Sequence, residues 1–208
     1  VSSPQEIIEL IEHAIRKVYD RPDGFIPLHA PFFKGHEWEY VKDCLNSGWV
    51  SSIGNYVNRF EEMICNFTGA GHAVATVNGT LALHIALLLS GVKEGDEVLC
   101  PAFSFVATVS AIVYCNAYPV FMDCDHKTLG MDVSKVSQFL SERCINKKDG
   151  YTYNRKTERK IKACIPMHAY GFPVDIEPLL SLCKDYNIEL IEDAAEALGS
   201  FYRGKHCG

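Results

Sequence analysis

The stretch that begins at Leu190 ends an apolar run with two carboxylates, Glu192 and Asp193, and continues with small residues. Ile188, Leu190 and Ile191 are typical of a buried parallel strand. Ligands of open α/β sheets bind beyond the carboxyl ends of the strands. A carboxylate there, followed by alanines that leave room, suits a flat ring whose basic nitrogen it keeps protonated. The alternative is that Asp193 caps a following turn or helix.

A second candidate is the turn Asn78-Gly79-Thr80, between an expected strand and an expected helix. Free backbone N–H groups at a helix N-terminus attract anions, so a phosphate could approach Gly79 and accept a hydrogen bond from Thr80. An ordinary Asn or Thr helix cap would explain the same residues. Gly69-Ala70-Gly71 precedes a strand instead of following one, so the dinucleotide fingerprint is absent.

Aromatic residues follow a third expected strand, which ends at Cys100. Phe103 or Phe105 at the mouth of a sheet could stack on a planar cofactor, and either could instead belong to the core. The three candidate sites therefore share one kind of position, the end of a strand.

The chain around these sites alternates short strands and helices, which predicts a mainly parallel sheet covered by helices on both faces, a three-layer αβα fold. Residues 141–160 are polar and are expected to form a solvated loop or a short excursion. Lys205 is expected in a polar turn. The remaining expected strands are 72–77, 97–100, 118–122, 161–167 and 188–191, and the expected helices are 80–89, 104–114, 132–140 and 176–185.

The composition narrows the function classes. The 208 residues suffice for one sizeable core, and the net charge of −6 disfavours a general nucleic-acid binder. Nine cysteines without a C-x-x-C spacing predict buried, reduced thiols in a cytoplasmic protein, and the histidines show no metal-ligand spacing. No apolar run has the length of a membrane span. Val1 to Ile15 lacks signal-peptide features; Ser3-Pro4-Gln5-Glu6 instead predicts a capped amphipathic helix.

Several segments together resemble the DegT/DnrJ/EryC1/StrS sugar aminotransferases, within the fold-type-I pyridoxal phosphate (PLP) enzymes. The resemblance runs from about Pro27 to Gly208. The matching segments are G-W-V-S-S-I-G (48–54) with F-E-E (60–62), N-G-T-L-A-L (78–83), G-D-E-V-L-C-P-A-F-S-F-V-A-T (95–108), H-A-Y-G-F-P-V-D (168–175) and I-E-D-A-A-E-A-L-G-S (191–200).

The resemblance assigns a role to each matching position. It implies that Gly79 and Thr80 bind the PLP phosphate, that Phe105 stacks on the ring, that Asp193 pairs with the ring nitrogen and that Ala195 lies under the ring. It further implies that Glu196 and Ser52 bind substrate, and that 168–175 shapes the site from behind. No metal is implied.

The implied activity is transfer of an amino group from glutamate to a nucleotide-linked 4-keto-6-deoxy sugar, with a UDP-linked N-acetylhexosamine favoured, for surface glycan synthesis. A homodimer with shared active sites is implied, without a nucleic-acid or membrane partner. Two alternatives stay open: a PLP-dependent sugar 3-dehydratase, and a non-catalytic regulatory protein with the PLP fold.

The resemblance also predicts how the chain is divided. Residues 1–26 are expected to form a helical extension, and residues 27–208 the PLP-binding large domain. The Schiff-base lysine of the family is not expected within residues 1–208, because Lys205 does not match its motif. The large domain is therefore expected to be incomplete at its C-terminal end, with the small C-terminal domain outside this chain.

Overall fold

The computed structural model describes residues 3–27 and 30–208, and the chain divides into two compact units, Val1–Ser52 and Ile53–Gly208. The first unit contains α1 (Pro4–Tyr19) and α2 (Glu37–Ser47), both without buried residues. Helix α1 begins with the predicted capping box, in which the Ser3 hydroxyl oxygen accepts from the Glu6 backbone N–H and the Glu6 carboxylate accepts from the Ser3 N–H. The domain boundary between residues 26 and 27 stays a prediction.

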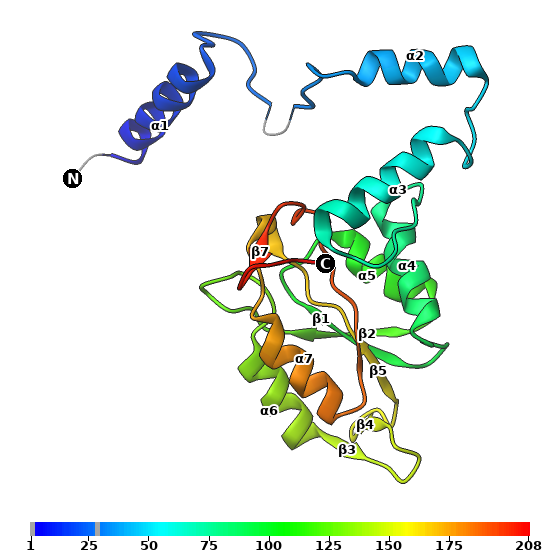
Figure 1. Cartoon of the computed structure of the whole chain (residues 1–208). Helices are drawn as coiled ribbons and strands as arrows, with labels where there is room; N and C mark the ends of the chain where they lie inside the picture. Colours follow the sequence, from blue (N-terminus) through cyan, green and yellow to red (C-terminus); the bar gives the residue numbers. More distant parts are fainter. Residues whose placement is uncertain (1–2, 28–29) are drawn as a thin grey trace. The chain divides into compact units, whose positions relative to one another are not determined.

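The second unit is organised around a four-stranded parallel sheet, seen near the centre of its ribbon in Figure 1. The strand order is β2-β1-β5-β6. Ladder hydrogen bonds continue past the end of β6, because the N–H groups of Ile191 and Asp193 bond to the carbonyls of Cys164 and Pro166. The strands are β1 (Glu97–Pro101), β2 (Tyr118–Met122), β5 (Ile161–Cys164) and β6 (Glu189–Leu190).

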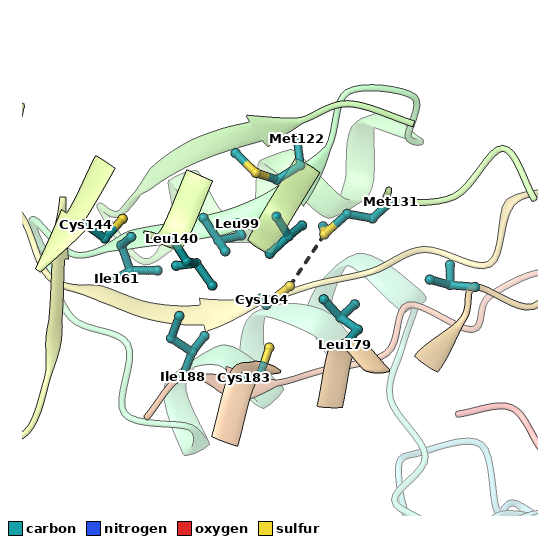
Figure 2. Close-up of a cluster of buried hydrophobic side chains, with 12 residues drawn as sticks. Leu99, Met122, Met131, Leu140, Cys144, Ile161, Cys164, Leu179, Cys183 and Ile188 are labelled. Atoms are coloured by element: carbon teal, nitrogen blue, oxygen red, sulfur yellow. Dashed lines mark hydrogen bonds between the residues drawn. The ribbon is translucent and has the colours of Figure 1, made fainter. Parts of the chain in front are cut away.

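Helices cover both faces of this sheet, which confirms the predicted three-layer α/β class. Successive side chains of a strand point to opposite faces, and β1 follows this rule. Val98 and Cys100 pack with Leu83 and Leu87 of α4 in one core, whereas Leu99 packs with α6 and α7 in the other (Figure 2). The helices are α3 (Asn55–Thr68), α4 (Gly79–Leu89), α5 (Val106–Tyr114), α6 (Val133–Arg143), α7 (Ile176–Asp185) and the short η1 (Ala169–Gly171).

The strand predicted at 72–77 is wrong. Within the described parts of the chain this segment joins no sheet, although its backbone N–H at Ala75 bonds to the Glu61 carboxylate at 2.7 Å. Val74 and Val77 are each 81 % exposed. A segment with alternating apolar residues forms a strand only where a neighbouring strand supplies ladder hydrogen bonds. No described strand pairs with this segment.

Of the two forms predicted for residues 141–160, a solvated loop or a short excursion, the structure shows the second, an antiparallel hairpin whose turn is exposed. Strands β3 (Cys144–Asn146) and β4 (Thr152–Asn154) pair, and Thr152 is fully buried with its hydroxyl donating to the Tyr186 carbonyl. Polar residues suggested exposure, but these polar groups satisfy one another in the interior. A second hairpin, β7 (Phe201–Tyr202) and β8 (Lys205–His206), contains Lys205, which lies in its second strand and not in the turn.

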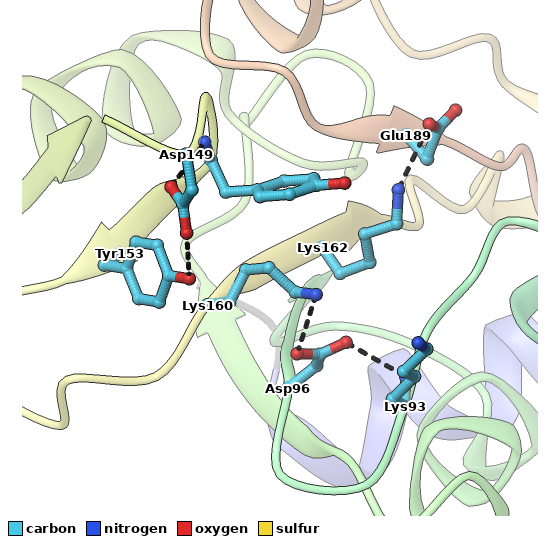
Figure 3. A network of polar contacts seen from close by, with 8 residues as sticks. Lys93, Asp96, Asp149, Tyr153, Lys160, Lys162 and Glu189 are labelled. Carbon is cyan, nitrogen blue, oxygen red and sulfur yellow. Dashed lines mark hydrogen bonds and ion pairs between the residues drawn. The ribbon is translucent and has the colours of Figure 1, made fainter. Parts of the chain in front are cut away.

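Charged residues at the starts of the strands join neighbouring strands of the sheet (Figure 3). The Lys160 ammonium lies 3.4 Å from the Asp96 carboxylate, and the Lys162 ammonium lies 3.3 Å from Glu189 on the adjacent strand. The Tyr153 hydroxyl donates to Asp149 across the turn of the hairpin at 2.7 Å. This edge of the sheet is therefore structural, opposite to the edge that carries the candidate site.

The cysteines are free thiols, as predicted. Cys44, Cys65 and Cys124 are partly buried, and the other six are buried. Burial raises the pKa of the Cys100 thiol to about 12 and, with the nearby Glu97 carboxylate, that of Cys144 to about 12. These thiols therefore act as small apolar side chains of the core. None of the described helices combines the length and apolarity that a bilayer crossing requires.

Candidate active site

A cavity of about 430 Å³ lies at the carboxyl ends of β1, β5 and β6, beside the first turn of α4. The chain leaves β1 for β2 on one side and later returns to β5 on the other, so the loops after β1 and β5 diverge and open a crevice between them. The cavity is lined by Gly79, Thr80, Leu83, Phe103, Ser104, Phe105, Ala107, Met167, Ala169, Tyr170, Asp193, Ala195 and Glu196. Every predicted site residue of the second unit is in this set.

Asp193 is held in the wall of the cavity by both its backbone and its side chain. Its carbonyl accepts from the His168 N–H at 3.1 Å, and its own N–H donates to the Pro166 carbonyl at 2.9 Å. The Thr108 hydroxyl donates to Asp193 Oδ2 at 2.6 Å, and the Ala195 N–H lies 3.4 Å from Oδ1. The side chain is 6 % exposed and still lines the cavity, so the carboxylate is available to a bound group and little hydrated.

Gly79 and Thr80 begin α4 and line the cavity, at the turn where the sequence predicts phosphate binding. The Asn78 side chain caps α4 by accepting from the Leu81 N–H at 2.9 Å. In the described part of the chain, the N–H groups of Gly79 and Thr80 have no acceptor. A Cβ at Gly79 would meet no atom within 4 Å, so open space lies in front of these donors. Both donors are free for a phosphate at the positive end of the helix.

Phe105 and Ala195 provide the apolar walls. Phe105 is 69 % exposed although it is a large aromatic residue, and it precedes the first residue of α5. The predicted helix from Ser104 therefore starts two residues later. Ala195 lies two residues after Asp193 and lines the same cavity. Its small side chain leaves the cavity open.

Glu196 faces the cavity, and its carboxylate is tied to the loop after β5. Its Oε2 accepts from the Tyr170 backbone N–H at 2.7 Å. Tyr170 has a φ of 53°, a left-handed conformation that is uncommon for a residue with a side chain. Gly171 packs against the Glu196 carbonyl so closely that a Cβ would lie 2.8 Å from that oxygen. The loop and the Glu196 segment therefore hold each other in place.

Behind the cavity, the buried imidazole of His168 joins two elements. Its Nδ1 accepts from the Val174 backbone N–H at 3.1 Å, so Nδ1 carries no proton. Its Nε2 lies 2.9 Å from Glu192 Oε2 and therefore donates to that carboxylate. This hydrogen bond, together with a second from the Gly208 N–H, lowers the pKa of the Glu192 carboxyl.

Glu192→Gln is expected to remove a pH-dependent part of the stability. A carboxyl with a lowered folded-state pKa contributes stability above its ordinary pKa of 4.5 and loses it as the pH falls through the folded value. The Gln side chain can still accept the proton of His168 through its carbonyl oxygen. Thermal midpoints measured from about pH 7 to pH 3.5 should show a gap between wild type and variant that closes at acid pH. A gap that stays constant over this range would contradict the expected role of the charge.

Several residues that line or support the cavity received no role in the sequence analysis. Thr108, Met167 and Tyr170 line or support the site and were given no individual role, although the matching segments contained Thr108 and Tyr170. Thr108 lies in the first turn of α5 and Ser104 in the loop before it, so no local pattern marked their hydrogen bond. Ser52 is exposed at the end of the first unit, and its substrate-binding role stays a prediction.

The fold and the cavity define an α/β protein whose cleft fits a flat, anionic ligand with a basic ring nitrogen. Residues 32–208 match the DegT/DnrJ/EryC1/StrS aminotransferase family, and the chain belongs to this family.

Individual relatives agree with this assignment. GDP-perosamine synthase of Escherichia coli O157:H7 is 41 % identical over 88 % of this chain and 46 % of its own length. An aminotransferase structure from Psychrobacter cryohalolentis is 29 % identical, covers 88 % of this chain and 42 % of that one, and has a TM-score of 0.73. A GDP-4-keto-6-deoxymannose-3-dehydratase structure with a trapped PLP–glutamate adduct is 21 % identical over 88 % of this chain and 45 % of that one, with a TM-score of 0.72, which shows the fold alone.

Family membership indicates PLP as the cofactor. The cavity fits this group in three ways: unpaired N–H donors at Gly79 and Thr80 for a phosphate, an exposed aromatic face at Phe105, and a poorly hydrated carboxylate at Asp193. The chain spans about half the length of the curated relatives it matches.

Proposed function

We propose that the protein is a PLP-dependent aminotransferase that moves the amino group of glutamate to a nucleotide-linked 4-keto-6-deoxy sugar. The observation that carries this proposal is the convergence of Gly79, Thr80, Phe105, Asp193 and Glu196 on one cavity. Bound PLP would supply an aldehyde that takes up the amino group and a ring that accepts electrons.

Each cavity residue has a distinct part in this proposal. Gly79 and Thr80 bind the phosphate, and Asp193 holds a proton on the ring nitrogen. Phe105 covers one face of the ring and excludes water from it, while Ala195 leaves the other face accessible. Glu196, fixed through Oε2 by Tyr170, orients the sugar through its remaining hydrogen-bonding capacity. The lysine that moves the proton between donor and acceptor carbons is expected beyond Gly208, as the family resemblance implies.

The identity of the sugar is part of the proposal. The family resemblance favours a UDP-linked N-acetylhexosamine, whereas the relative that is 41 % identical is named for a GDP-linked sugar. A homodimer with shared sites and a role in surface glycan synthesis in the cytoplasm remain proposals from the same resemblance.

The direct test supplies the full-length protein with PLP, glutamate and either a GDP-linked or a UDP-linked 4-keto-6-deoxy sugar. We expect one amino sugar to form for each 2-oxoglutarate released, and the two nucleotides will show different rates that identify the substrate. A sugar product that has lost its 3-hydroxyl and gained no nitrogen, seen by mass spectrometry, would instead establish the 3-dehydratase. Absence of any reaction with bound PLP would favour the regulatory alternative.

Glu196→Ala separates the role of Glu196 from that of the cofactor-binding residues. The conversion of glutamate to 2-oxoglutarate should be largely unchanged, while the reaction with the keto sugar slows more than about tenfold, since a hydrogen bond to a charged group contributes about 1.5–3 kcal/mol. Both half-reactions are measured by single-turnover absorbance. Equal losses in both would place Glu196 on the cofactor, and no loss in either would make it a solvent-facing charge.

A further inference from the structure

Thr108 is a fully buried hydroxyl residue that contacts the key carboxylate of the cavity. It lies in the first turn of α5, 85 residues from Asp193 in sequence, and its Oγ1 is 2.6 Å from Asp193 Oδ2. An ionised carboxylate can only accept hydrogen bonds, so the Thr108 hydroxyl is the donor. Its single proton is therefore committed to Asp193.

This commitment fixes the direction of the next hydrogen bond. Ser104 Oγ lies 2.9 Å from Thr108 Oγ1, and since the Thr108 proton is already used, Ser104 must donate. Ser104 Oγ also lies 3.5 Å from Met167 Sδ, a weak acceptor that cannot supply a proton. The result is a directed chain from Ser104 through Thr108 to Asp193, in which each bond polarises the next.

The chain restricts the way Asp193 can turn. Its backbone is fixed on both sides by bonds to Pro166 and His168, and Oδ2 is fixed by Thr108. Among residues 3–27 and 30–208, Oδ1 receives only a long contact of 3.4 Å from the Ala195 N–H. Oδ1 is thus the oxygen with hydrogen-bonding capacity left for a ligand in the cavity.

We propose that Thr108 is a positioning residue, oriented by Ser104, that holds the Asp193 carboxylate in place with Oδ1 left for the nitrogen of a bound pyridine ring. The proposal rests on the proposed function, because it takes the PLP ring as the ligand of this cavity. Val has the shape of Thr without the hydroxyl, and Ser keeps the hydroxyl without the methyl group. These two replacements at one position therefore separate the hydrogen bond from packing.

The test measures binding of pyridoxamine phosphate to the full-length protein by fluorescence titration, beside the same compound with carbon in place of the ring nitrogen. Thr108→Val should weaken binding of pyridoxamine phosphate by about tenfold, while Thr108→Ser stays within about twofold of wild type. Binding of the carbon analogue should be the same in all three proteins, because it has no ring nitrogen for Asp193 to hold. Thermal midpoints without ligand establish that each variant is folded.

The partly buried Ser104 offers a second variant should Thr108→Val fail to fold. Ser104→Ala should weaken binding of pyridoxamine phosphate to a smaller extent and again spare the carbon analogue. Equal weakening of both ligands, or unchanged binding of pyridoxamine phosphate in both variants, overturns the role of Thr108 while leaving the proposed function intact. Wild type that binds neither ligand overturns the proposed function itself.

Discussion

Asp193→Asn is expected to bind pyridoxamine phosphate and to lose amino transfer from glutamate by about a hundredfold or more. The amide has the shape of the carboxylate but no negative charge, so it cannot keep a ring nitrogen protonated. Because the side chain is 6 % exposed, water cannot replace the missing charge effectively. The Thr108 hydroxyl can still donate to the amide oxygen, which keeps the local packing.

The measurement is a single-turnover assay with glutamate, followed at the absorbance bands of the cofactor. Asp123→Asn is the matched control, since Asp123 follows the neighbouring strand β2 and lies outside the cavity. We expect the control to keep the wild-type rate. A near wild-type rate in Asp193→Asn would show that this residue only caps the turn after the strand, the alternative that the sequence left open.

Glu97→Ala is expected to cause the largest loss of stability, roughly 3 kcal/mol or more. Glu97 is 2 % exposed at the start of the central strand β1. Its Oε2 accepts from Asn154 Nδ2 at 2.9 Å and its Oε1 accepts from the Thr157 hydroxyl at 2.6 Å. Truncation leaves two donors without an acceptor beneath the sheet and loosens the β3–β4 hairpin from it.

The expected loss lowers the thermal midpoint of the full-length protein by about 6–12 °C, measured by calorimetry. Glu94→Ala is the control, because Glu94 is exposed and lies three residues earlier. Glu97→Gln should fall between them. Its amide oxygen can accept from Asn154 Nδ2 while its amide nitrogen donates to the Thr157 hydroxyl, so both contacts can form without the negative charge. If the thermal midpoint of Glu97→Ala equalled that of the control, the hydrogen bonds from Asn154 and Thr157 to Glu97 would contribute no net stability.

The elements predicted correctly are those whose signal is local. The nearly all-apolar run after Asn78 folds as α4 and buries Leu83 and Leu87, and the apolar run of β1 is buried along its whole length. The prediction failed or left alternatives open where a segment depends on distant neighbours. Residues 72–77 have strand-like residues and no partner strand in the described parts of the chain, and the polar 144–154 hairpin folds because Glu97 and Tyr186 receive its hydrogen bonds.

The sequence by itself determined the alternation of sheet strands and helices from α4 onward, the positions of Phe105 and Asp193 beyond strand ends, that of Gly79 at the start of a helix, and through its motifs the family. These follow from hydrophobic period, turn residues and the rule that parallel strands end at one edge. Only the tertiary structure decided that the Thr108 hydroxyl reaches Asp193 and that the Tyr170 N–H holds Glu196. Both contacts join residues from different strand–helix units, and their geometry depends on how those units pack, which no local pattern specifies.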